Sequence, residues 1–162
     1  MTDTPDSPDT SDSDGTRLDL EREIATEVAW MQVTLDKVAV HLLQQNAASI
    51  QRIDGSTLAG YCAYRTEDGL RCAIGCLLSD EEAAKMEGRG VRNFPSSLLT
   101  KLLGRPPAFQ PTEWEAAFQP TGIDSRVEFL NALQKIHDSM VVTTWRAELC
   151  ALAARHQFQV RF

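Results

Sequence analysis

Three of the four cysteines fall within one short stretch, which is the first place to look for chemistry. Cys62, Cys72 and Cys76 supply thiols, while His137 and Asp138 supply an imidazole and a carboxylate farther along the chain. Thiolates and imidazoles are the usual ligands of structural zinc, and a thiol with a histidine and an acid can act as a catalytic nucleophile. The sequence therefore raises two hypotheses, a metal site and thiol-dependent hydrolysis.

A zinc site would use Cys62, Cys72, Cys76 and His137 as its candidate ligands. Structural zinc sites present pairs of the Cys-x₂₋₄-Cys kind, and only Cys72 and Cys76 have that spacing. A second pair is missing. The alternative is that reduced cysteines pack as small apolar residues. We favour this second interpretation, so a metal-free core with no cofactor is expected.

Hydrolysis would use Cys72 or Cys76 as nucleophile, His137 as base and Asp138 to orient it. The sequence shows no oxyanion feature, and alanine and isoleucine follow Cys72, which indicates a buried, unreactive thiol.

Metal-dependent hydrolysis through His137 and Asp138 is a further hypothesis. Adjacent helical residues diverge by about 100°, so these two are not expected to face one metal ion. The structural interpretation is that His137 bonds a backbone or carboxylate partner, as buried polar groups usually do. These observations leave open whether the protein is an enzyme, and they favour the expectation that it is not.

A long helix is predicted over residues 18–46, with a break near 31–34 left open. The apolar stripe is wider than a single seam, which favours packing into a core, and a homodimer through the 24–42 seam is the alternative. The seam residues recur at helical spacing, at Ile24, Val28, Met31, Leu35, Val38 and Leu42.

A β-hairpin is predicted over residues 61–73, with the turn at Glu67-Asp68-Gly69 and Tyr64 opposite Cys72. The turn carries the candidate binding residues for a partner. The alternative is a solvated, charge-balanced turn. These candidates are Arg65, Glu67, Asp68 and Arg71.

Shorter helices are predicted after the hairpin from caps and breakers. Ser79 and Glu82 have capping-box spacing, and Asp124 or Ser125 can cap a later helix. Alternating apolar residues at 158–162 predict a possible third strand. The fold class is therefore α+β, mostly helical, with one core. The predicted helices cover residues 80–86, 95–103, 111–118, 125–140 and 144–156.

Charge is concentrated at the N-terminus. Residues 1–16 hold five aspartates and no lysine or arginine, which accounts for −5 of the net charge of −7. Their composition predicts a disordered acidic tail before a single globular domain over 17–162. A tail of this kind is either a solubilising leader or a segment that binds a basic partner or mimics nucleic acid.

Several classes of protein are excluded or disfavoured by composition. No apolar run is long enough for a membrane span, and no secretory signal is expected. The nearly neutral domain lacks the basic stripe of a nucleic-acid-binding protein. Cysteines in a chain without a signal are typical of cytoplasmic thiols.

The motifs together resemble a family of small bacterial and phage-encoded proteins whose activity is uncharacterised. The resemblance covers about residues 35–155 and implies a cytoplasmic protein of a bacterium or mobile element, with no activity to transfer. It rests on His41-Leu42-Leu43-x-Gln45 with Ser49, Cys62-x-Tyr64-Arg65, Gly69-x-x-Cys72-Ala73-Ile74-Gly75-x-Leu77-Leu78-x-Asp80-Glu81, Glu87-Gly88-x-x-Val91, Leu133-Gln134-Lys135-Ile136-His137-Asp138 and Trp145.

We therefore expect a small interaction or regulatory protein that acts by binding another protein. The alternative is a thiol- or metal-dependent hydrolase that uses Cys72 or Cys76 with His137 and Asp138. A weaker alternative is an inhibitor that mimics nucleic acid through its acidic tail.

Overall fold

The longest element of the computed structural model is helix α1, Asp12–Gln45, which runs without a break for 34 residues. The structure describes residues 12–52, 60–107, 124–139 and 141–162. The helix begins inside the stretch predicted as a disordered tail, so that prediction is wrong for residues 12–16. The earlier part of the tail lies outside the described residues. The prediction of a long N-terminal helix is confirmed.

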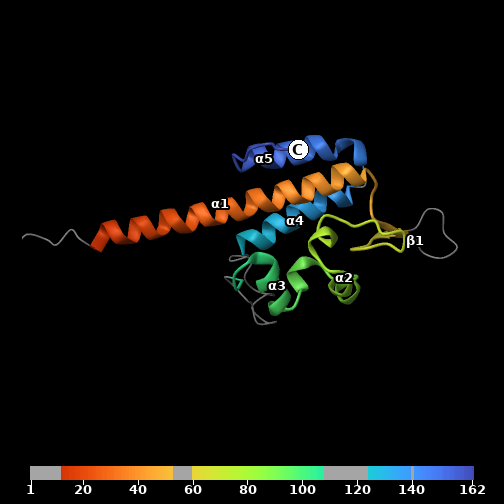
Figure 1. Ribbon diagram of the computed structural model, residues 1–162, viewed down its shortest axis with the longest axis horizontal. Helices are drawn as coiled ribbons and strands as arrows, with labels where there is room; N and C mark the ends of the chain where they lie inside the picture. The colour runs from red at the N-terminus through yellow and green to blue at the C-terminus, as the bar shows by residue number, and fades with distance from the viewer. Residues whose placement is uncertain (1–11, 53–59, 108–123, 140) are drawn as a thin grey trace, which may run out of the picture.

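Helices α4, Ser125–Asp138, and α5, Trp145–Arg155, pack against the C-terminal part of α1 (Figure 1). A short 3₁₀ helix, η3, Val142–Thr144, leads into α5. The first core cluster lies among these three helices and contains Leu35, Leu42 and Leu133. The helices predicted at 125–140 and 144–156 are confirmed over the described residues.

The sheet is an antiparallel pair of short strands, β1, Ile50–Arg52, and β2, Gly60–Cys62. A hairpin was expected and is present, but its strands differ from the predicted ones. The predicted return strand at residues 70–73 makes only one bridge, between Arg65 and Arg71. That bridge has the predicted register.

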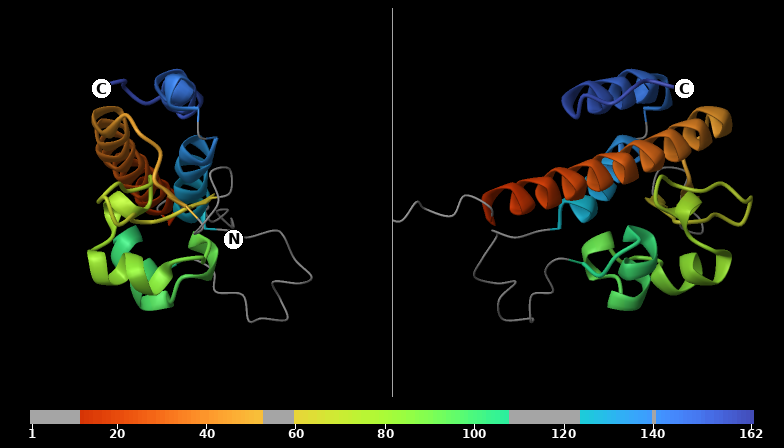
Figure 2. Two further views of the ribbon diagram at one scale, coloured as in Figure 1. Left: turned by 90° about the vertical axis from the view of Figure 1, so that its right-hand side faces the viewer. Right: turned by 60° about the vertical axis from the view of Figure 1, so that its left-hand side comes forward.

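A second layer lies below α4, built from the turn after β2 and a series of short helices (Figure 2). Val127 and Leu130 of α4 pack into this second core cluster, so α4 joins the two clusters. The short helices are η1, Gly75–Leu77, α2, Asp80–Met86, η2, Val91–Asn93, and α3, Ser96–Leu103.

Most helix boundaries follow from local chemistry. Ser79 and Glu82 form the predicted capping box of α2. Gly104 adopts a left-handed conformation, with φ of 67°, and ends α3. Asp124 caps α4 by accepting the Arg126 backbone N–H. The helix predicted at 111–118 lies outside the described residues.

The C-terminal residues do not form the predicted third strand. The backbone of Gln159 pairs instead with the side-chain amide of Gln32 on α1, through two hydrogen bonds of 2.9 Å. Phe158 and Phe162 pack against the first core cluster. The alternation in this segment therefore reflects docking of aromatic rings on α1 and its neighbours. Over the described residues, no helix has both the length and the apolar content needed to cross a membrane.

Candidate functional site

Cys62 of β2 meets His137 and Asp138 at the C-terminal end of α4. One ligand atom from each lies within 4.8 Å of the others, and no further group of three possible metal ligands occurs among the described residues. The expectation that His137 and Asp138 diverge is therefore wrong. The Asp138 carboxylate turns back to within 3.3 Å of His137 Nδ1.

His137 is completely buried, and its hydrogen bonds define which ring nitrogen carries the proton. The Ser49 backbone N–H donates to Nε2 at 2.9 Å, so Nε2 must be unprotonated. The ring proton is then on Nδ1, which faces Cys62 Sγ and Asp138 Oδ1, each at 3.3 Å. This matches the structural interpretation of His137, a buried histidine with a backbone and a carboxylate partner.

A metal ion at His137 Nδ1 would require a change of tautomer. A metal bound at Nδ1 would displace its proton to Nε2, which would then point a hydrogen at the Ser49 N–H. Metal-bound histidines instead donate their second N–H to an acceptor. Cys72 and Cys76, two of the predicted ligands, do not join the cluster. The group around Cys62 thus offers three possible ligands, with His137 held in the tautomer that carries its proton on Nδ1.

The Cys62 thiol is held in its protonated form. Its hydrogen bond with Cys72, followed by burial and the Asp138 charge, raises the pKa of Cys62 well above the ordinary value. The Gln134 amide donates to Cys62 Sγ at 3.1 Å, but this does not offset the other effects. A thiol in this state is a poor nucleophile.

Cys72 and Cys76 differ in the direction of their pKa shifts. Cys72 is completely buried, and its sulfur accepts the Gly75 N–H at 3.2 Å. Burial acts to raise the pKa of Cys72, but hydrogen bonds from Cys62, Gly75 and Ile74 outweigh it, so the pKa is lowered. Burial raises the pKa of Cys76 to about 12.

Within the part of the chain that the structure describes, His137 is not positioned as a base for either thiol. His137 bonds Cys62, and its second nitrogen is occupied by Ser49. The hydrolase hypothesis therefore gains no support from this geometry.

The Asp138 carboxylate is stabilised in its charged form. Partial burial acts to raise the pKa of Asp138, but hydrogen bonds from His137, Cys62 and Gln134 lower it below the ordinary value. Gln134 donates to Asp138 at 2.7 Å and accepts the Ile74 N–H at 3.1 Å. Gln134 is thus a bridging residue of the cluster. Its signal in the sequence is its i,i+3 and i,i+4 spacing from His137 and Asp138.

The candidate binding residues of the turn are only partly free. Arg65 and Arg71 both pair with Asp80 at the start of α2, so their charges are used within the fold. Arg71 also donates to the Leu78 carbonyl at 3.1 Å. Glu67 and Asp68 are exposed at the tip of the turn. The turn is thus closer to the charge-balanced interpretation than to a basic recognition loop.

Comparisons with known proteins add no identity. No family model matches the chain, and neither do the curated proteins or the solved structures with which it was compared. The resemblance to bacterial and phage-encoded proteins stays a prediction.

Proposed function

We propose that this chain is an interaction protein that binds another protein through the N-terminal part of α1. The observation that carries the proposal is that residues 12–29 of α1, the projecting segment, extend past the ends of the other helices (Figure 1), and that Glu27 near its end pairs with Arg105 and Arg126. Its apolar residues Leu20, Ile24 and Val28 have exposed fractions of 57%, 54% and 46%. Exposed apolar patches of this kind mark interaction sites.

The exposed stripe continues the buried face of the same helix. Met31, Leu35 and Val38 follow Ile24 and Val28 at the same spacing and pack into the first core cluster. A helix of 34 residues is about 50 Å long, far more than this core needs. The pattern therefore specifies one continuous apolar face, of which the fold covers only the C-terminal part.

The projecting segment and the tail also hold the whole net charge. Residues 1–27 contain nine acidic and two basic residues, which gives −7, so residues 28–162 are neutral in sum. Within the segment, Asp19, Glu21 and Glu23 flank the apolar stripe. The complementary partner surface is an apolar groove with basic residues on its rim, which is a common way to bind an amphipathic helix.

The proposal places this interaction in the cytoplasm of a bacterium or of a cell infected by a phage. Its support is the sequence resemblance together with the four cysteines, all of which are free thiols. A basic partner in that setting is consistent with a regulatory role.

A second copy of the chain is the competing occupant of this face. A homodimer through the 24–42 seam is the alternative, but Met31, Leu35, Val38 and Leu42 of that seam face the chain's own core. Of the seam residues, Ile24 and Val28 stay exposed, which is a short contact compared with the standard size of a stable interface. The structure thus favours a different protein as partner.

The test is site-specific photo-crosslinking of the full chain in bacterial cells. A photoreactive residue at position 24, on the apolar stripe, is compared with one at position 22 on the opposite side of the helix. We expect one discrete adduct from position 24 and none from position 22. The crosslinked protein is then purified, and its binding is measured with Val28→Asp at about 50 and 500 mM salt.

Loss of binding in Val28→Asp, with weaker binding at high salt, supports the proposal. Equal adducts from positions 22 and 24, no adduct, or salt-independent binding overturns it. An adduct of twice the chain mass shows the homodimer instead.

A further inference from the structure

A cleft of about 660 Å³ lies between β2, the loop after α2 and helix α4. This volume is within the range of small-molecule sites. The cleft shares no residue with the projecting segment, so it is a separate feature of the molecule. Its chemistry is carried by Tyr61, Cys62, Arg89, Arg92, Lys135 and Asp138.

The cations of the cleft have little charge compensation. Arg92 approaches Glu128 at 3.8 Å, with both side chains more than half exposed, so this pair is weak. No ion pair to Arg89 or Lys135 is found among the described residues. The cleft has one carboxylate, Asp138, and it is bound to its own neighbours.

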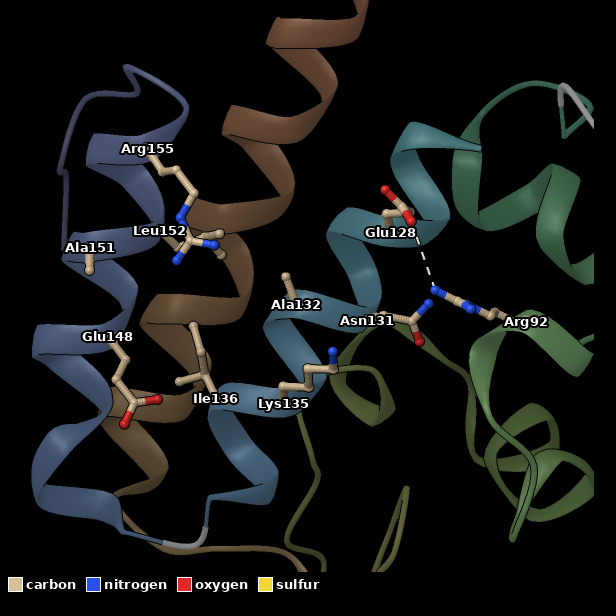
Figure 3. A pocket seen from close by; sticks show the side chains of 10 residues that line it. All are labelled: Arg92, Glu128, Asn131, Ala132, Lys135, Ile136, Glu148, Ala151, Leu152 and Arg155. Carbon is tan, nitrogen blue, oxygen red and sulfur yellow. Dashed lines mark ion pairs between the residues drawn. The ribbon is translucent and has the colours of Figure 1, made fainter. Parts of the chain in front are cut away.

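A second cleft of about 450 Å³ continues along α4 toward α5 and shares Arg92, Asn131 and Lys135 with the first. Figure 3 shows Arg92 and Lys135 extending toward the space beside Asn131, from η2 and from α4. Arg155 and Glu148 lie at the other end, on α5. Arg92 and Lys135 therefore both line the place where the two clefts join.

The loop that carries Arg89 is held at the rim by the hairpin. The Tyr64 hydroxyl donates to the Arg89 carbonyl, and the Tyr64 N–H donates to Glu87 at 3.0 Å. Gly88 and Gly90, on either side, have open space where a side chain would stand. The loop thus presents an Arg89 side chain and bare backbone to the cleft.

We infer that this cleft binds a small anionic ligand, with its phosphate or carboxylate group between Arg89, Arg92 and Lys135. Arginine and lysine form charge-assisted hydrogen bonds with both groups. Tyr61 and Asp138 line the same cleft.

The test uses two probes, inorganic pyrophosphate and citrate, added separately to the full chain at low ionic strength. Backbone amide shifts are followed by NMR, and affinity is measured by calorimetry. We expect saturable shifts centred on residues 88–92 and 131–135. The double variant Arg92→Ala, Lys135→Ala should bind about tenfold or more weakly, because two charge-assisted contacts are lost.

Lys37→Ala is the matched control, because Lys37 is an exposed cation of α1 outside both clefts. Tighter binding of pyrophosphate identifies a phosphate ligand, and tighter binding of citrate a carboxylate; either supports the inference. Absence of saturable shifts, or equal weakening in Lys37→Ala and the double variant, overturns it. Unchanged amide spectra of the free variants show that their folds are intact.

Discussion

His137 connects three distant stretches of the chain at one buried point. Its ring accepts a hydrogen bond from Ser49, faces Cys62 and packs against Trp145 with ring centroids 5.3 Å apart. The group of Cys62, His137 and Asp138 therefore joins the hairpin, α4 and α5. Its polar atoms satisfy one another, which is what burial of such groups requires.

His137 stabilises the fold through its Nε2 atom, which accepts the buried Ser49 N–H. His137→Gln places an oxygen near the Nε2 position, whereas His137→Asn places its amide near Nδ1. We expect His137→Asn to lower the free energy of unfolding by about 3 kcal/mol, because the buried Ser49 N–H loses its partner and the core loses volume. His137→Gln should lose about half as much. Urea unfolding measures both, and equal losses would contradict the proposed role of Nε2.

Gly75 lies where the loop after Cys72 crosses the hairpin. A Cβ at this position would overlap the Tyr64 carbonyl oxygen, which is backbone and cannot rotate away. We expect Gly75→Ala to lower the free energy of unfolding by about 2–4 kcal/mol. Gly90→Ala is the control, since its Cβ meets nothing within 4 Å, and it should change stability by under about 0.5 kcal/mol. A benign Gly75→Ala would show that the two backbones are not in contact.

At the scale of elements, a buried charge network joins α1 to the ends of α3 and α4. Arg126, 4% exposed, pairs with Glu27 at 2.8 Å and lies over the Trp30 ring at 4.8 Å. Arg105 contacts both Glu27 and Asp124. This network determines where α1 leaves the body of the protein and the projecting segment begins.

The network makes stability depend on pH. Partial burial acts to raise the pKa of Glu27, but hydrogen bonds from Ser125 and Arg126 and the nearby arginine charges lower it below 4.5. Because the folded-state pKa is depressed, the Glu27 contribution is complete above about pH 4.5 and is lost as pH falls further. We expect Glu27→Gln to cost about 2 kcal/mol at pH 7 and less at pH 3.

Urea unfolding of both proteins at the two pH values measures this difference. Glu21→Gln removes an exposed pair with Arg17 and should cost under about 0.5 kcal/mol at either pH. A Glu27→Gln cost that is equally large at pH 3 would show that its effect is not electrostatic.

The two parts of α1 should respond differently to the same kind of substitution. Leu35 is completely buried, so Leu35→Ala should lower the free energy of unfolding by about 2–5 kcal/mol. Ile24 is 54% exposed, so Ile24→Ala should change it by under about 1 kcal/mol and affect partner binding instead. Thermal unfolding of the isolated chain checks both. A large loss for Ile24→Ala would place that residue inside the fold.

At the scale of the whole molecule, the folded core and the net charge lie in different parts of the chain. The neutral body carries the core, the clefts and the buried cluster, while the projecting segment and tail carry the net charge of −7. Opposite charge on a partner would speed association and make it sensitive to salt. The distribution is suited to a protein whose body presents a helix to its target.

Local sequence patterns were sufficient to predict the helices. The buried faces of α4 and α5 and the capping box of α2 follow from residues within a few positions of one another. The strands were harder to predict from the sequence. Strand β1 lies in a polar stretch, and its pairing depends on β2, which follows a connecting segment. The pairing of Cys62 with His137, 75 residues apart, has no local signal.

The sequence by itself determined the long amphipathic helix, the capped helices, the register of the Arg65–Arg71 bridge and the concentration of charge near the N-terminus, since these depend on residue type and short spacing. Tertiary structure alone decided which part of the α1 face is covered and which ring nitrogen of His137 carries the proton. It also decided how far each cysteine is buried. The physical reason is that burial and hydrogen-bond partners come from distant parts of the chain, and the pKa of a thiol depends on both.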